Sequence, residues 1–253
     1  MVETAIEAAR SAGELAYRYF KTQSASRRIK YKPDNSPVTR ADIEAEKLIR
    51  KTISKKFPDH GIIGEELKAV NPNARYVWVI DPIDGTRSYV RGLPMWATLL
   101  ALLEKNKPII GISFSPATDE FFVAQKGKGT YLNGKRTKVT KIKNIKFSFM
   151  VHGSIHYFAK IGKLDQLVKL CENTLGHRGF GDAFGYNLLT SGKVDFLIEA
   201  NAAIHDLAAP SILVQEAGGK FTDFSDKFSL TSGNGVATNG LLHNQVLKIL
   251  NSG

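Results

Sequence analysis

The segment Trp78-Val79-Ile80-Asp81-Pro82-Ile83-Asp84-Gly85-Thr86 places two carboxylates directly after a short apolar run. That run, residues 75–81, is typical of a buried strand. Pro82 lacks an N–H group, so we expect the strand to end there. Gly85 and Thr86 predict the start of a short helix, whose backbone N–H groups suit a phosphate. The segment therefore predicts an acidic site at the carboxyl end of a buried strand.

Two further acidic positions follow the same pattern at other predicted elements. Gly64-Glu65-Glu66 comes after a short apolar strand, and Asp206 begins a helix predicted over 206–217. Carboxylate oxygens are the hard ligands that Mg²⁺ prefers. Taken alone, the two aspartates of the first segment are explained equally well as turn and N-cap residues. Four carboxylates at separate elements favour a site for more than one metal ion.

The remaining pattern predicts a mixture of helices and strands. Helices are expected over 1–23, 40–56, 161–172, 181–191, 206–217 and 241–251, and strands over 97–103, 108–113, 121–125, 129–132, 147–151, 195–199 and 236–238. No internal repeat or long linker divides the chain. We therefore expect one domain over 1–253, with an N-terminal lobe of about 1–140 and a C-terminal lobe of about 145–253.

Composition restricts the class of protein. The chain has 253 residues, of which 43% are hydrophobic and 23% charged, as in globular proteins. No apolar run could span a bilayer, and residues 1–20 predict an amphipathic helix rather than a signal peptide. The single cysteine, Cys171, excludes an intrachain disulfide. We expect a cytoplasmic protein without a membrane partner.

The net charge of +11 points to an anionic partner, either a nucleic acid or a small phosphate ester. The basic stretch 27–32 and the following residues 33–37 predict a mobile loop that can gate an anionic substrate. A basic RNA-binding or regulatory protein is the alternative of another class. The chain lacks basic motifs interleaved with aromatic residues, so nucleic acid is not the expected partner.

Gly64-Glu65-Glu66, the segment 78–86 and the stretch 206–219 together resemble the inositol monophosphatase superfamily, in order and over nearly the whole chain. The resemblance implies an α+β fold, the layered αβαβα sandwich of the inositol monophosphatase/fructose-1,6-bisphosphatase type. It also implies a Mg²⁺-dependent phosphomonoesterase that hydrolyses a small phosphate ester with metal-activated water. Two or three Mg²⁺ ions per site and a homodimer are further implications.

The resemblance gives a role to each matching residue. It assigns metal ligation to Glu65, Asp81, Asp84, Asp206 and the backbone carbonyl of Ile83. It assigns catalysis to Glu65 and Thr86, which orient the attacking water, and to Asp42, which hydrogen-bonds the threonine. Backbone N–H groups of Gly85 and Thr86 are expected to hold the phosphate.

Asp182 and Glu199, with Asp206, are the residues expected to face the leaving group of the substrate. The stretches 35–39, 57–66, 87–94 and 181–186 resemble the histidinol-phosphatase branch. A carboxylate at Asp182 suits a substrate that carries an amine, so we expect histidinol phosphate and a place in histidine biosynthesis. The alternative makes Asp182 a helix N-cap and the protein an inositol-1-monophosphatase, with or without fructose-1,6-bisphosphatase activity.

One residue departs from the family pattern. His205 stands where the family usually has a tryptophan, and it either tunes Asp206 or packs or faces solvent. The other histidines show no metal-ligand spacing and are expected to be structural. Cys171 falls inside an apolar predicted helix and is expected in the core.

Overall fold

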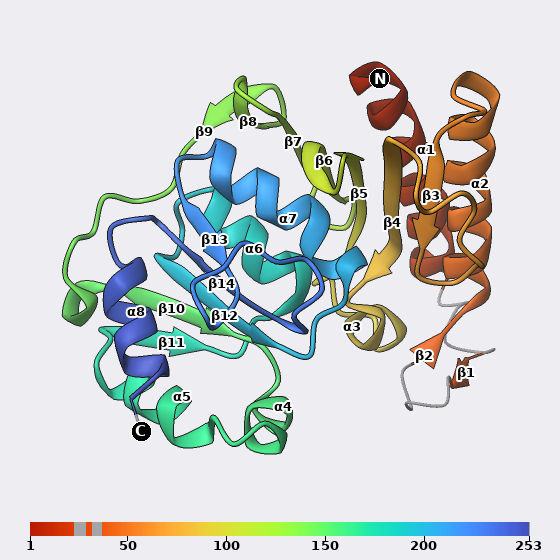
Figure 1. Cartoon of the computed structure of the whole chain (residues 1–253). Helices are drawn as coiled ribbons and strands as arrows, with labels where there is room; N and C mark the ends of the chain where they lie inside the picture. The colour runs from red at the N-terminus through yellow and green to blue at the C-terminus, as the bar shows by residue number, and fades with distance from the viewer. Residues whose placement is uncertain (23–28, 32–36, 253) are drawn as a thin grey trace.

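The computed structural model describes residues 1–22, 29–31 and 37–252 (Figure 1). Most of the basic loop expected over 27–37 lies outside these residues. Its described part forms the short strands β1 (Lys30–Tyr31) and β2 (Pro37–Val38), which pair antiparallel. Among the described helices, none is both long and apolar enough to cross a membrane.

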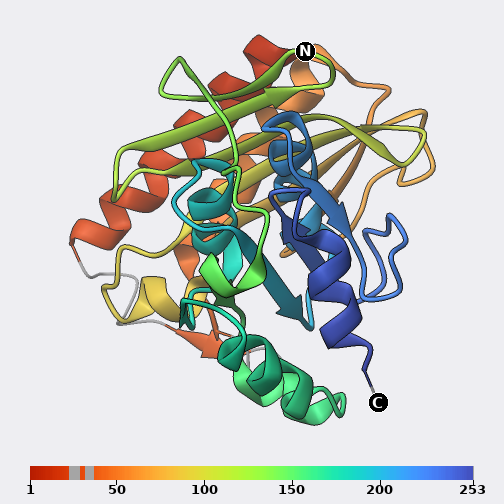
Figure 2. The same cartoon turned by 90° about the vertical axis from the view of Figure 1, so that its left-hand side faces the viewer.

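Helices and sheets alternate in layers, which confirms the predicted αβαβα sandwich (Figures 1 and 2). The first layer holds α1 (Val2–Lys21) and α2 (Arg40–Lys56). The first sheet has the order β3-β4-β5-β6-β7-β8-β9, formed by Gly61–Gly64, Tyr76–Asp84, Ala97–Glu104, Lys107–Ser115, Glu120–Gln125, Gly129–Leu132 and Lys135–Thr137. The short helix α3 (Thr86–Val90) follows β4.

The middle layer consists of α6 (Asp182–Thr190) and α7 (Ile204–Glu216). The second sheet has the order β11-β10-β12-β14-β13, formed by Gly176–Arg178, Phe149–His152, Phe196–Ala200, Asn234–Thr238 and Lys220–Thr222. Its outer face is covered by α4 (Ile155–Lys160), α5 (Leu164–Glu172) and α8 (His243–Leu250). A 3-10 turn, Ile145–Phe147, precedes β10.

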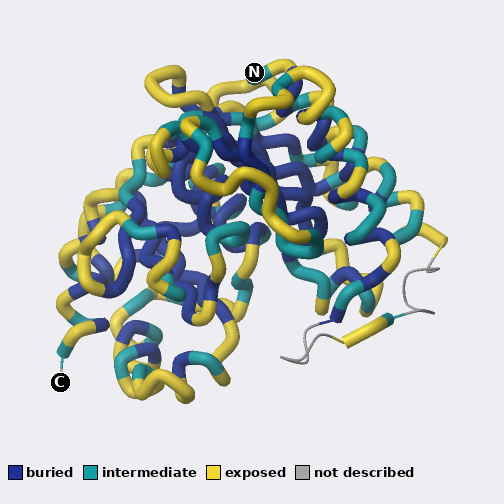
Figure 3. Tube along the Cα trace, turned by 45° about the vertical axis from the view of Figure 1, so that its right-hand side comes forward, coloured by how far each residue is buried: buried dark blue, intermediate teal, exposed yellow. Residues whose placement is uncertain are grey.

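Alternate residues of the central strands enter different cores, because side chains of a strand point to opposite faces of the sheet. In β5, Leu99 packs toward the middle helices, whereas Leu100 and Leu102 pack toward α1 and α2. In β12, Leu197 faces the middle helices and Ile198 faces the outer ones. Both sheets therefore need helices on each side, and their central strands β4, β5 and β12 lie in the buried interior (Figure 3).

Strand β4 is longer than the sequence predicted. It continues through Pro82 to Asp84, and its pairing with β5 shifts register between Asp81 and Asp84. Pro82 thus lies in a bulge, where its missing N–H costs no ladder bond. Its carbonyl accepts a hydrogen bond from the Thr98 hydroxyl at 2.8 Å. The prediction that Pro82 ends the strand was wrong.

The helix predicted over 161–172 was also wrong in its extent. Helix α5 begins only at Leu164, helix α4 has already ended at Lys160, and Gly162 lies between them with φ of 68°. This left-handed conformation ends a helix and is accessible to glycine without strain. Strands β11 and β13, of three residues each, were not predicted.

Helix α7 packs closely against the first sheet at Gly111 of β6. A Cβ atom there would lie 2.8 Å from the carbonyl oxygen of Ala209 and would also overlap Ile212. We expect Gly111→Ala to reduce the free energy of unfolding by about 1–3 kcal/mol, because helix and sheet must separate. Urea unfolding measures this loss. The matched control Gly179→Ala meets only the His152 ring at 3.5 Å and should change stability little, so equal losses would contradict the packing argument.

Candidate active site

A cleft of about 1300 Å³ is lined by residues from both halves of the chain. The N-terminal half contributes Glu65, Gly85, Thr86 and Arg87, and the C-terminal half contributes Asp182, Glu199, His205 and Asp206. Asp81, Ile83 and Asp84 are buried in β4 beside these residues. The structure therefore brings together positions that are separated by more than half of the sequence.

Three aspartates form a compact carboxylate cluster next to the cleft. One carboxylate oxygen from each of Asp81, Asp84 and Asp206 lies within 4.8 Å of the others. The bulged end of β4 supplies the first two, and the first turn of α7 supplies the third. Asp206 Oδ2 also accepts a hydrogen bond from the Ala203 N–H at 2.6 Å. Asp206 therefore caps the start of α7 and also belongs to the carboxylate cluster, so the two explanations for this residue do not exclude each other.

The carboxylates of the cluster resist ionisation without a counter-ion. Burial raises the pKa of Asp81 well above its usual range, and repulsion from Glu65 and Asp84 adds to this shift. Burial also raises the pKa of Asp84, with Asp182 adding, although the Ala183 N–H donates to Asp84 at 2.5 Å. A bound cation removes both the repulsion and the cost of burying charge.

The donor set fits a divalent cation that takes oxygen ligands. The cluster offers buried carboxylates, and Glu65 approaches Asp81 in a second group that also includes His205. The Ile83 carbonyl accepts a hydrogen bond from the Thr86 hydroxyl at 2.9 Å, which leaves its second lone pair. Carboxylate and carbonyl oxygens are the ligands that Mg²⁺ takes in proteins. The chemistry of these residues therefore matches the ion that the sequence predicted.

The hydrogen bond expected between Asp42 and Thr86 is not formed among the described residues. Asp42 Oδ2 instead accepts from the N–H of Thr39 at 2.8 Å and from its hydroxyl at 2.5 Å, in a capping box of α2. Thr86 donates to Ile83. Asp42 Oδ1 is buried without a hydrogen-bond partner in the described structure. The expected contact was wrong for this structure.

Glu46 in α2 was missed by the sequence analysis, although it positions the turn that carries Glu65. Its side chain is fully buried, and its Oε2 accepts from the Glu66 N–H at 2.8 Å. Arg50 Nε lies 2.7 Å from the other carboxylate oxygen. Gly64 leaves the space that this carboxylate fills, since a Cβ atom there would overlap it. An acid and an arginine four residues apart on the buried side of a predicted helix were the available signal.

Asp182 and Glu199 lie together on the C-terminal side of the cleft. Glu199 is buried at the end of β12, and its Oε2 accepts from the Asp182 N–H at 3.1 Å. Gly153 and Gly181 make room for Glu199, because a Cβ atom at either position would overlap its carboxylate. Two glycines and one backbone N–H group therefore fix the position of the Glu199 carboxylate beside the cluster.

Asp182 is not the N-cap of α6. That position is held by Gly181, and the cap has no side-chain hydrogen bond. Asp182 opens onto the cleft with φ of 56°, and the surrounding protein raises its pKa to about 6 by desolvation. Repulsion from Asp206 adds to the shift, and the Arg87 guanidinium opposes it. The capping alternative weighed for this residue is thus wrong.

His205 lies beside the cluster. Its side chain is half-buried, and Nε2 lies 3.6 Å from Asp206 Oδ1. It also shares a group of donor atoms with Glu65 and Asp81. His205 lowers the pKa of Asp206 against the stronger effect of burial. Of the two sequence-based alternatives, the structure supports a histidine that acts on Asp206.

Comparison with known proteins identifies close relatives of the chain. The profile of the inositol monophosphatase family matches residues 1–252. The histidinol-phosphatase of Mycobacterium tuberculosis is 36% identical over 231 residues, which cover 89% of each chain. A fructose-1,6-bisphosphatase/inositol-1-monophosphatase of Thermotoga maritima is 35% identical over 216 residues, covering 85% of this chain and 82% of that protein.

The solved structures agree with this result. The extragenic suppressor protein suhB from Bartonella henselae superposes with a TM-score of 0.92 at 27% identity. The match covers 99% of this chain and 98% of the other. The architecture is therefore shared along the entire described chain.

Replacing Glu46 tests its role in positioning Glu65. We expect Glu46→Ala to destabilise the protein by about 3 kcal/mol, because it breaks a buried ion pair and leaves a buried N–H without its acceptor. The affinity for Mg²⁺ should fall at least about tenfold. Urea unfolding and calorimetric titration measure the two effects. The control Glu44→Ala removes a partly exposed pair with Arg40 on the same helix and a hydrogen bond from the Tyr19 hydroxyl, but no contact to the turn of Glu65, so it should alter both far less.

The unpartnered oxygen of Asp42 predicts a pH-dependent cost in metal-free protein. Burial raises its pKa from 3.8 to about 6, against hydrogen bonds from Thr39. Because the folded state holds the proton more tightly, wild-type stability falls as pH rises from about 4 to about 6. We expect Asp42→Asn to stabilise the metal-free protein by about 2–3 kcal/mol at pH 8 and little at pH 4. Urea unfolding with EDTA across this range measures it; a difference independent of pH would contradict the argument.

Proposed function

The chain belongs to the inositol monophosphatase family and is a metal-dependent phosphomonoesterase, and from its cleft we propose that its substrate is histidinol phosphate. The observation that carries this proposal is the pair of carboxylates, Asp182 and Glu199, beside the cluster. The proposal concerns the alcohol part of the ester, since hydrolysis of the phosphate is the activity of the family.

The charge of the cleft favours an amine-bearing substrate. Divalent ions bound at the cluster would offset the charge of the aspartates there. Asp182, with a pKa of about 6, is mostly ionised at neutral pH and adds negative charge on this side of the cleft, whereas burial and repulsion from Asp182 raise the pKa of Glu199 well above its usual range. An ammonium group gains Coulomb energy there, and more of it in a partly dry cleft than in water, whereas a neutral polyol gains none. Histidinol phosphate carries such a group next to its phosphate ester.

The relatives support the proposal without deciding it. The relative from Mycobacterium tuberculosis is named histidinol-phosphatase, and it is 36% identical to this chain. The relative from Thermotoga maritima has another named activity at 35% identity. Identity alone therefore does not separate the two substrates, and the carboxylate pair carries the choice.

We propose the following division of work among the residues. Asp81, Asp84, Asp206 and Glu65 hold the ions, with the Ile83 carbonyl. Mg²⁺ held by these residues would lower the pKa of water and would stabilise the leaving oxygen of an in-line displacement. Thr86 and Glu65 orient the attacking water, and the N–H groups of Gly85 and Thr86 hold the phosphate. Asp182 and Glu199 hold the amine, which fixes the ester bond relative to the water.

Comparing phosphate release from three substrates tests the proposal. We expect the highest kcat/KM for histidinol phosphate over inositol-1-phosphate and fructose-1,6-bisphosphate, and loss of all turnover in EDTA with recovery in Mg²⁺. Asp182→Asn should lower kcat/KM for histidinol phosphate at least about tenfold, the equivalent of 1.4 kcal/mol. It should change the values for the other two substrates much less.

The control is Asp165→Asn, an equal change of charge at an exposed position of α5. It should leave all three values unchanged. A preference for either of the other substrates would reject histidinol phosphate while leaving the phosphatase activity intact. Equal losses in Asp182→Asn on all three substrates would show that Asp182 serves the metal cluster and not substrate choice.

A further inference from the structure

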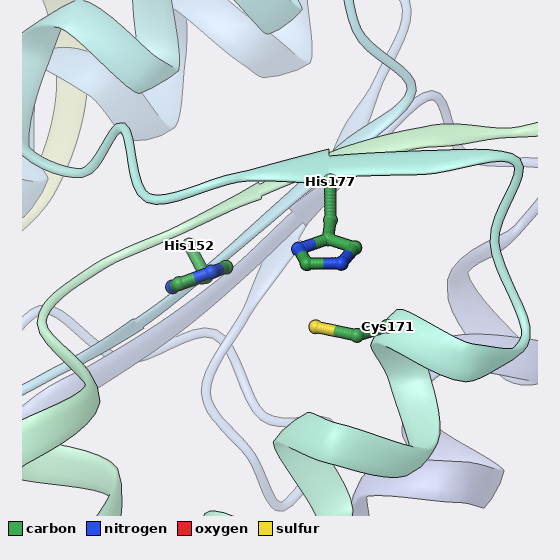
Figure 4. Close-up of side chains that lie close together, drawn as sticks. All are labelled: His152, Cys171 and His177. Carbon is green, nitrogen blue, oxygen red and sulfur yellow. The ribbon is translucent and has the colours of Figure 1, made fainter.

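Three metal-ligating side chains lie together outside the carboxylate cluster. They are His152, Cys171 and His177, and one donor atom from each lies within 4.8 Å of the other two. Figure 4 shows Cys171 reaching from α5 toward His177, with His152 beside them. From the sequence, the two histidines were expected to be structural because they show no metal-ligand spacing, and Cys171 was expected in the core because it falls inside an apolar helix.

Strand register explains why the two histidines meet. Strands β10 and β11 run parallel, with Met150 opposite His177. Side chains alternate between faces, so His152, two residues after Met150, lies on the same face as His177. Helix α5 covers that face, and Cys171 lies in its last turn. The sandwich therefore brings three donors from three elements to one place.

His152 is already oriented as a metal ligand. Its side chain is only 5% exposed, and its Nδ1 lies 2.8 Å from the carbonyl oxygen of Gly153. A carbonyl only accepts, so this contact assigns the proton to Nδ1 and leaves the Nε2 lone pair free. A histidine whose other nitrogen donates to a backbone carbonyl is the common arrangement in metal sites. Burial lowers the pKa of His152 and keeps the ring neutral.

Cys171 and His177 supply the adaptable part of the group. Cys171 is half-buried and packs at the edge of the core beneath α5, and burial raises the pKa of its thiol. His177 is exposed and can turn without disturbing the interior. Donors around a tetrahedral ion are separated by about 3.3–3.8 Å, given bonds of about 2.0–2.3 Å. A movement of about 1 Å by these two side chains would close the group.

We propose that His152, Cys171 and His177 form a Zn²⁺-binding site with a fourth position open to water. Two imidazoles and one thiolate are borderline-soft donors, which suit Zn²⁺ and do not suit Mg²⁺. The carboxylate cluster offers only oxygen ligands, which are hard donors and suit Mg²⁺. Binding releases the thiol proton of Cys171, so affinity for Zn²⁺ rises with pH. The site adjoins the cleft, because His152 and Gly153 line it.

Cobalt is the probe that separates this site from the carboxylate cluster. The chain has one cysteine, so a thiolate-to-Co²⁺ charge-transfer band reports Cys171 alone. The full-length protein is treated with EDTA, returned to excess Mg²⁺ and titrated with Co²⁺. We expect a band that saturates at one ion per chain and disappears when Zn²⁺ is added.

Variants identify the other ligands. His177→Ala should weaken Co²⁺ binding by at least about tenfold, because it removes a direct ligand. Cys171→Ser should abolish the band. His156→Ala, a change at another exposed histidine, should leave it unchanged. Asp81→Asn, which alters the carboxylate cluster, should also retain the band.

The outcomes that overturn the proposal are specific. Absence of the band in wild-type protein, or a band that His177→Ala leaves unchanged, rejects the site. A band that requires two chains per ion, seen as Co²⁺-dependent association in light scattering, rejects a site within one chain. Because His177 is exposed, thermal unfolding should show that His177→Ala folds like the wild type. None of these results depends on the identity of the phosphate ester.

Discussion

Repulsion among the buried carboxylates of Asp81, Asp84 and Asp206 is the unfavourable interaction that the rest of the structure has to offset. Burial and mutual repulsion disfavour their charged forms. The backbone offsets part of this cost, since Asp84 accepts from the Ala183 N–H at the start of α6 and Asp206 from the Ala203 N–H at the start of α7. Both middle helices thus direct the positive ends of their dipoles toward the acids. A metal ion bound by these acids would offset the remaining cost.

Glycines make the space that the other carboxylates of the site require. Gly64 lies against the Glu46 carboxylate, which in turn holds the turn carrying Glu65. Gly153 and Gly181 lie against Glu199 in the same way. A Cβ atom at any of these positions would overlap a buried carboxylate, Glu46 or Glu199, which has little room to move elsewhere. The positions of the acids are therefore fixed by missing side chains as much as by hydrogen bonds.

The second sheet separates two kinds of metal ligand. Hard carboxylate oxygens lie toward the cleft, and softer imidazole and thiol donors lie toward the outer helices. Glu199 in β12 lines the cleft, whereas His152, which pairs with Ile198, lies with Cys171 and His177 toward the outer helices and also borders the cleft. Side chains alternate along β12, so that Ile198 faces the outer helices and the neighbouring Glu199 faces the cleft. Hard and soft metal ligands can thus coexist in one chain without competing for the same ion.

The sequence by itself determined the features that depend on short spacing. The apolar run before Asp81 and the turn at Gly85 predicted an acidic site at the end of a buried strand, because period and turn chemistry act between near neighbours. The layered fold was implied by the resemblance of the three acidic motifs to a known family. Only the tertiary structure decided which distant groups meet. It paired Asp42 with Thr39 and not with Thr86, gave Glu46 its role, and assembled His152, Cys171 and His177. These contacts depend on strand register and on which helix covers which face, and neither is encoded in local periodicity.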